Sequence, residues 1–101
     1  MIKVLNRKDP EAKGGFNIMR GTALGNPFVI GEHGNREEVI EKYRQWLWGQ
    51  MNQDVRTRAL DVLLYLAVKH SEGEDIKLVC CCKPLACHGD IVKRAIGWLA
   101  K

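Results

Sequence analysis

The stretch IKLVCCCKPLACHGDIV, residues 76–92, predicts a strand, a stop and a helix in close succession. Residues 76–82 are mostly apolar, which is typical of a central strand buried on both faces. Pro84 has no backbone N–H to donate, so the strand cannot continue through it. A helix is then expected from about His88 to Ala100, with a buried face made of Ile91, Val92, Ala95, Ile96 and Leu99.

Two amphipathic helices are predicted upstream of this strand. Asn35 and Glu38 have the spacing of a capping box, so the first helix should cover about residues 36–51. Asp54 is the expected N-cap of a second helix over about residues 54–70. Apolar residues recur at helical spacing in the first helix, at Val39, Ile40, Tyr43, Trp46 and Leu47. The second helix carries more apolar residues and should be more deeply buried.

The N-terminal third predicts two short strands, at residues 1–6 and 16–20. About nine residues join them, too few for a helical crossover, so a hairpin is expected. Residues 21–35 are rich in glycine and should form an ordered loop with at most one short strand, at residues 28–30. These elements predict a single α/β domain over residues 1–101, with a short mixed sheet of about three strands and three helices.

The composition fits one globular domain of 101 residues, 46% hydrophobic and 28% charged. The longest apolar run, residues 62–68, is far too short for a membrane span, and no signal peptide is recognisable. The cytoplasm is therefore expected, where thiols stay reduced and a disulfide framework is disfavoured. The charge of +4 favours anionic partners. No run of Lys or Arg exceeds two residues, so nucleic acid is not expected.

A candidate anion site lies where the last helix begins, at Cys87, His88 and Gly89. The first turn of a helix exposes backbone N–H groups and carries a partial positive charge, which favours anion binding. The same field would lower the pKa of the Cys87 thiol if that thiol is accessible. Gly89 would let a ligand approach the backbone closely, and Asp90 could cap the turn.

The cysteines have three interpretations, which stay open. The simplest is that Cys80, Cys81 and Cys82 are small core residues of a buried strand. A zinc site would use Cys80, Cys82, Cys87 and His88, whose chemistry suits zinc, although adjacent ligands do not have the usual spacing. A nucleophilic Cys87 activated by His88 would lack an identifiable orienting group. No cofactor is therefore expected, and zinc is the alternative.

The segment GNPF, residues 25–28, is either a plain turn or part of a ligand site. As part of a site, Gly25 would admit a ligand to the backbone and the Asn26 amide would contact a base or ribose. Arg20 could bind phosphate through its forked guanidinium. Arg36 lies in the first turn of a helix, where its positive charge is unfavourable beside the positive end of the helix dipole. A bound anion facing Arg36 would explain a cation at this position.

Two motifs resemble those of domain-of-unknown-function family 4326, a group of short proteins found in phages and microbial genomes. The pattern Leu-x-Cys-x-Cys-x-Pro-x-x-Cys-His-Gly-Asp is matched by Leu78, Cys80, Cys82, Pro84, Cys87, His88, Gly89 and Asp90. The family also has an Arg, then a Gly-Asn-Pro-Phe element, then an Arg-Glu-Glu helix start. These are matched by Arg20, Gly25-Asn26-Pro27-Phe28 and Arg36-Glu37-Glu38. The chain departs from the family at Cys81, where Trp is frequent, and at Leu24, where Trp or Lys is frequent. The resemblance implies a phage or prophage origin and one shared pocket. It does not indicate any activity.

The sequence thus predicts a small phage-type binding protein for an anionic, nucleotide-like molecule, located in the host cytoplasm if phage-encoded. The expected ligand-binding residues are Arg20, Gly25, Asn26, Pro27, Phe28, Arg36, Cys87, His88, Gly89 and Asp90. Such a protein could sequester a host defence signal nucleotide without catalysis.

Two other functions stay open. The chain could inhibit a host protein through its basic surface and an exposed Trp48, or it could process a nucleotide or nucleoside. In the second case His88 or Cys87 would act with Asp90 as acid and base. No membrane partner is expected, and self-association is left open.

Overall fold

The computed structural model describes residues 1–52, 56–81, 85 and 87–101. Its strands are β1 (Ile2–Asn6), β2 (Phe16–Asn17) and β3 (Ile76–Cys80). Its α-helices are α1 (Arg36–Met51), α2 (Arg58–Ser71) and α3 (Gly89–Leu99), and a 3-10 helix, η1, covers Pro10–Ala12. The predicted α/β class, with three strands and three helices, is confirmed. Within the described residues, no helix is long and apolar enough to cross a membrane.

The sheet has the order β1-β3-β2, and both outer strands run parallel to β3. The expected hairpin between the first two strands was wrong, and so was the mixed sheet. The register explains how a short connection is sufficient. Asn6, the last residue of β1, pairs with Cys80, and Phe16, the first residue of β2, pairs with Leu78. The connection therefore moves back along the strand direction by only two residues of β3, about 7 Å. A full helical crossover is not needed over that distance.

The first helix follows the sequence prediction at both ends. Asn35 accepts a hydrogen bond from the Glu38 backbone N–H, and the Glu38 side chain accepts one from the Asn35 backbone N–H, which confirms the capping box. The second helix begins later than expected, because the Thr57 hydroxyl caps it by accepting from the Leu60 N–H at 3.2 Å. The expected cap, Asp54, lies outside the described residues.

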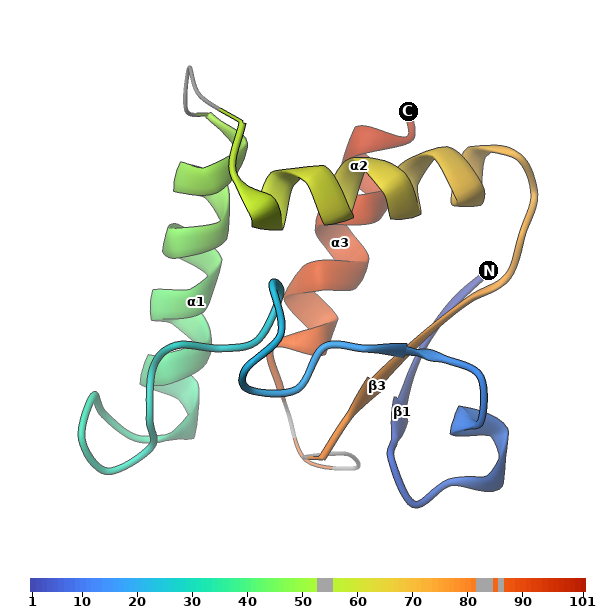
Figure 1. Cartoon of the computed structure of the whole chain (residues 1–101). Coiled ribbons are helices and arrows are strands. Elements are labelled where there is room, and N and C mark those ends of the chain that lie inside the picture. The colour runs from blue at the N-terminus through green and yellow to red at the C-terminus, as the bar shows by residue number, and fades with distance from the viewer. Residues whose placement is uncertain (53–55, 82–84, 86) are drawn as a thin grey trace.

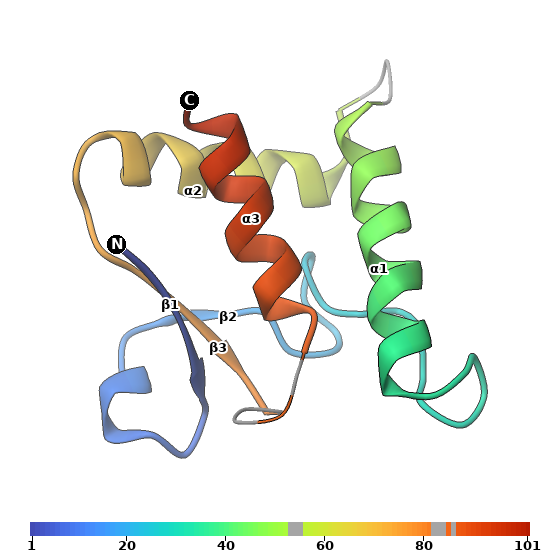
Figure 2. The ribbon, with the colours of Figure 1, turned by 180° about the vertical axis from the view of Figure 1, so that it is seen from behind.

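The three helices gather on one side of the sheet (Figure 1). Helix α3 stands between α1 and the strands and contacts β1 and β3, while α2 runs across the upper ends of both helices (Figure 2). The core lies between these layers and includes Ile18, Leu24, Leu63, Leu78 and Ile96, each fully buried. Residues 16–20 were expected to be a strand, but β2 stops at Asn17, and residues 28–30 form no strand.

Candidate functional site

A small cavity of about 90 Å³ lies at the carboxyl ends of the parallel strands. Met19 and Arg20 follow β2, and Cys81 follows β3. The first turn of α1, residues of the loop before it and the two residues directly before α3, Cys87 and His88, complete the walls. Ligands of open α/β sheets commonly bind at this edge. Of the residues predicted for the site, six line the cavity: Arg20, Asn26, Phe28, Arg36, Cys87 and His88.

Arg20 holds the neighbouring loop in shape. Its Nη1 donates to the Asn26 carbonyl at 3.0 Å and its Nη2 to the Phe28 carbonyl at 3.4 Å. The Asn26 side-chain oxygen accepts from the Phe28 backbone N–H at 2.9 Å, which tightens the same turn. A guanidinium has five N–H donors, so these two bonds use only part of the hydrogen-bonding capacity of Arg20.

His88 is buried and neutral. Its Nε2 lies 2.6 Å from the Ile18 carbonyl, which can only accept, so Nε2 carries the proton and Nδ1 is an acceptor. Burial lowers the pKa of His88, and the nearby Arg20 charge adds to that lowering. The ring also packs edge-on against Tyr43, with 5.0 Å between centroids. The imidazole therefore acts mainly as a link between α3 and the segment after β2.

Cys87 is a buried thiol. Burial raises its pKa to about 12, and a sulfur contact of 3.3 Å with Cys80 adds to the shift. The sequence predicted a lowered pKa only for an accessible thiol, and that condition is not met, because Cys87 is only 2% exposed and loses its hydration. A thiol with this pKa is a poor nucleophile at neutral pH.

Two glycines of the predicted site serve packing. A Cβ at Gly89 would lie 2.6 Å from Val4 Cγ1 and 3.2 Å from Ile18 Cδ1, so the glycine lets α3 approach the sheet. A Cβ at Gly25 would lie 2.6 Å from the Met19 carbonyl oxygen, inside its own loop. Neither residue lines the cavity, and Pro27 and Asp90 do not line it either.

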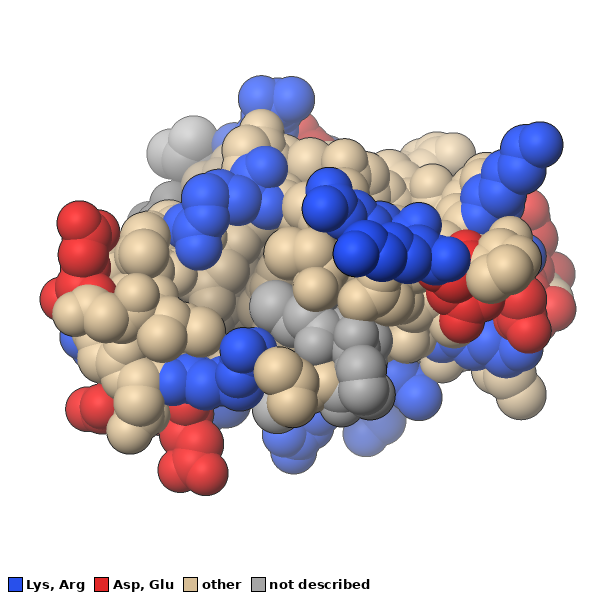
Figure 3. Space-filling view, turned by 90° about the horizontal axis from the view of Figure 1, so that it is seen from below, with Lys and Arg blue, Asp and Glu red and all other residues tan. Residues whose placement is uncertain are grey.

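The backbone N–H groups that open α3 are largely engaged. The Gly89 N–H donates to Cys87 Sγ at 3.4 Å, and the Asp90 N–H to the Cys87 carbonyl at 3.2 Å. This turn would therefore attract an anion mainly through the positive field of the helix end, and less through free N–H donors. The positive charge at the cavity comes mainly from Arg20 and Arg36. Seen from below, several Lys and Arg side chains lie across the middle of this face, and acidic side chains lie toward its margins (Figure 3).

Sequence reasoning missed several cavity residues. Met19, Ile30, Val39, Ile40 and Cys81 also line it and make one wall apolar. Val39 and Ile40 were predicted only to be part of the buried face of the first helix. The N-terminal turn of that helix, α1, also reaches the edge of the cavity. A clue existed in the short distance along the chain between these residues and Arg36.

The proposed zinc ligands do not converge within the described residues. Cys80 and Cys87 are in contact, but the Nε2 of His88 is occupied by the Ile18 carbonyl. Cys82, the remaining candidate, lies outside the described residues, as does Pro84. The described part of the chain contains no group of three or more His, Cys, Asp or Glu that could hold a metal.

Comparisons with known proteins place the chain in a family. It is 34% identical over 86 residues to an uncharacterized 12.4 kDa protein from the nrdA-td intergenic region of Enterobacteria phage T4. The match covers 84% of this chain and 69% of that protein. No solved structure matches the chain. A family model, Domain of unknown function (DUF4326), matches residues 3–98. The chain therefore belongs to this phage-associated family of domains.

Proposed function

We propose that the chain binds a phosphate-bearing nucleotide and holds it without chemical change. The observation that supports this is the convergence of Arg20 and Arg36 on one cavity that is also lined by the first turn of α1 and by His88, the N-cap of α3. Both the guanidinium charges and the helix fields favour an anion there. The apolar wall beside them would exclude water from part of the bound group.

The size of the cavity defines which part of the ligand it would hold. Pockets that enclose whole drug-sized ligands have volumes of roughly 300–1,000 Å³. A cavity of about 90 Å³ is smaller and suits a single phosphate group. The sugar and base would then lie outside it, near the Phe28 ring and the Asn26 amide, whose Nδ2 has no hydrogen bond within the described residues. A base could stack on the phenyl ring there.

Sequestration is favoured over turnover by the state of the cavity side chains. Cys87 is protonated at neutral pH because its pKa is about 12, and the Nε2 proton of His88 is held by a backbone carbonyl. Cys87 is therefore a poor nucleophile, and His88, whose pKa is lowered by burial, is a weakened base. In a phage-associated protein, binding of this kind would remove a nucleotide signal of the host from circulation.

Calorimetric titration with inorganic phosphate, a nucleoside monophosphate, a nucleoside triphosphate and a cyclic dinucleotide would test the proposal. At least one nucleotide should bind more tightly than phosphate, and mass spectrometry should recover it intact. Arg20→Ala should weaken binding roughly 10- to 100-fold, the scale of a charge-assisted hydrogen bond. Lys13→Ala, an exposed charge on another part of the surface, is the control.

Three results would contradict this function. Equal losses from Arg20→Ala and Lys13→Ala would indicate diffuse electrostatics and no site. Recovery of an altered nucleotide would indicate an enzyme. If none of the four probes binds at millimolar concentration, the proposal that the chain binds a nucleotide is wrong.

A further inference from the structure

A second and larger concavity lies between α1 and α3, away from the cavity described above. Its volume is about 580 Å³, and it shares no lining residue with the smaller cavity. Leu47 and Met51 of α1 and Ile91 and Ala95 of α3 line it with apolar side chains. The two helices stand side by side when the molecule is seen from behind (Figure 2). We call this concavity the α1–α3 groove.

Two indoles also line the α1–α3 groove. Trp48 and Trp98 meet edge to face, with 5.4 Å between ring centroids and 82° between ring planes. Trp98 is 52% exposed, and Trp48, which was expected to be exposed, is half-buried. An exposed Trp beside aliphatic side chains is typical of an interface anchor.

The charges that line the α1–α3 groove have one sign. Arg44, Arg94 and Lys101 line it, and no described Asp or Glu does. Arg44 is partly neutralised by Glu41, whose Oε2 lies 2.6 Å from its Nη2. Arg94 and Lys101 form no ion pair with any of the described residues. Arg44 and Arg94 lie in mid-helix, so the negative helix ends offset their charge little.

We propose that the α1–α3 groove binds an acidic amphipathic helix of a partner protein. Aliphatic side chains spaced at i, i+3/i+4 and i+7 on that helix would pack against Met51, Ile91 and Trp98. Carboxylates on its flanks would face Arg94 and Lys101, which gives complementary charge. This proposal does not depend on the nucleotide site, because the two surfaces have no residue in common.

A protein partner fits the groove better than a nucleic acid does. Bases bind single-stranded sites by stacking on open aromatic faces along a basic track. Here one indole directs its edge at the face of the other, and the apolar part of the remaining lining is aliphatic. Aliphatic floors of this kind receive the apolar face of a helix.

Fluorescence anisotropy would test the proposal with a synthetic probe. The probe is a fluorescein-labelled helical peptide of about 16 residues, the length of α1, with Leu on one face and Glu on the other. We expect saturable binding, and at least roughly tenfold weaker binding of a peptide with Lys in place of Glu. Trp98→Ala and Arg94→Glu should each weaken binding of the acidic peptide at least roughly tenfold.

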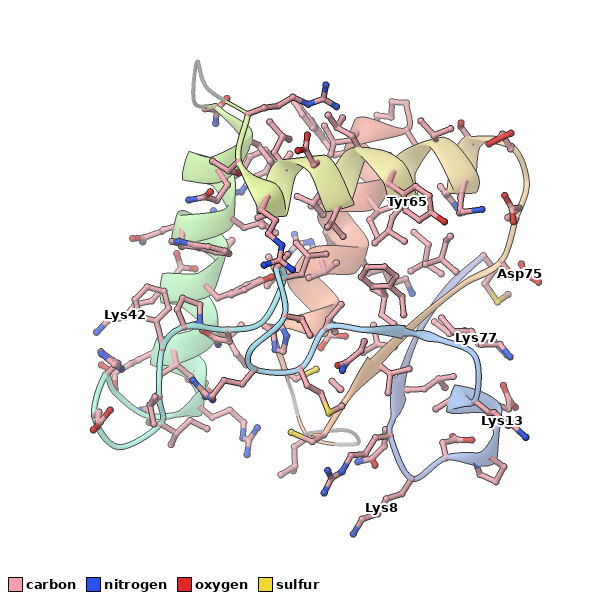
Figure 4. All side chains as sticks on the ribbon, in the orientation of Figure 1. Lys8, Lys13, Lys42, Tyr65, Asp75 and Lys77 are labelled. Atoms are coloured by element: carbon pink, nitrogen blue, oxygen red, sulfur yellow. The ribbon has the colours of Figure 1, made fainter. Side chains whose placement is uncertain are left out.

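Matched controls separate the α1–α3 groove from general effects. Lys93→Glu makes the same charge change on the neighbouring exposed residue of α3, which does not line the groove. Tyr65→Ala removes an exposed aromatic ring from α2, on the side of the molecule shown in Figure 4. Both variants should bind within about twofold of the unmodified protein, and thermal unfolding would verify that all four variants fold.

Three outcomes would overturn the proposal. The first is no saturable binding of the acidic peptide at about 1 mM, or equal loss from Arg94→Glu and Lys93→Glu. The second is tighter, Trp98-dependent binding of an oligothymidylate, which would assign the groove to nucleic acid. The third is a dimer in analytical ultracentrifugation that Arg94→Glu dissociates, which would assign the groove to a second copy of the chain.

Discussion

The hydroxyl of Tyr43 donates a 2.6 Å hydrogen bond to the backbone carbonyl of Leu24. Both residues are fully buried, so the bond joins α1 to the loop that carries Asn26 and Phe28. Burial raises the pKa of Tyr43 well above its usual value, which keeps the hydroxyl protonated as a donor. The position of that wall of the cavity therefore depends on a side chain in the core.

Tyr43→Phe should destabilise the protein by about 1–3 kcal/mol. The substitution keeps the ring but leaves the buried Leu24 carbonyl without a partner, which costs its desolvation. Urea unfolding of the variant would measure the loss. Tyr65→Phe, at an exposed position, should change the free energy of unfolding by less than about 0.5 kcal/mol. Similar values for the two variants would contradict a structural role of the bond.

Gly89→Ala should destabilise the fold by roughly 1–3 kcal/mol, because the new methyl group would overlap Val4 Cγ1. Gly97→Ala in the same helix provides the contrast, since a Cβ there meets nothing within 4 Å. Its better helix propensity should raise the free energy of unfolding by up to about 1 kcal/mol. If Gly89→Ala were as stable as the unmodified protein, close packing of α3 on the sheet would not be the reason for this glycine.

Stability should fall as the pH drops below about 6.5, the unfolded pKa of histidine. Burial lowers the pKa of His88 in the folded protein, so between the two pKa values the unfolded chain binds more protons. The contribution of His88 to the free energy of unfolding is fully present above its unfolded pKa. It is lost as the pH falls through its folded pKa. His88→Gln should show a flatter stability profile below about pH 6.5. A pH slope for His88→Gln equal to that of the unmodified protein would refute the assignment to His88.

Alkylation should discriminate among the cysteines in a Cys82→Ser background. Cys81 is exposed, whereas Cys80 and Cys87 are buried. At pH 8 a thiol of pKa about 12 is ionised in roughly one molecule in ten thousand, against about a quarter for an ordinary thiol. Iodoacetamide should therefore modify Cys81 alone until urea exposes the other two. Rapid modification of Cys87 in the folded protein, seen by peptide mass spectrometry, would show that it is reactive.

The fold could be predicted wherever local chemistry decided it. The Asn35–Glu38 capping box located the start of α1, and the apolar run from Ile76 located the central strand. The pairing of the strands could not be predicted in this way. Whether β1 pairs with β2 or with β3 depends on contacts far apart in the chain, and a nine-residue connection is compatible with both arrangements.

The candidate site was partly accessible to the same reasoning. Arg20 and the segment from Gly25 to Phe28 were expected together, and Arg20 does hydrogen-bond to the Asn26 and Phe28 carbonyls. The reasons for the glycines were not accessible, because the contact of Gly89 with Val4 joins residues at opposite ends of the sequence. The state of Cys87 was missed for a similar reason: the helix field was visible in the sequence, and the depth of burial was not.

The central place of β3 has a consequence for synthesis of the chain on the ribosome. β1 and β2 flank β3 and both pair with it, yet 58 residues separate Asn17 from Ile76. At a translation rate of about 5–20 residues per second, the first two strands wait roughly 3–12 s for their common partner. Only after β3 has emerged can the sheet form and the cavity at its carboxyl edge take shape. The nascent protein is thus exposed to proteases and chaperones until its last quarter is made.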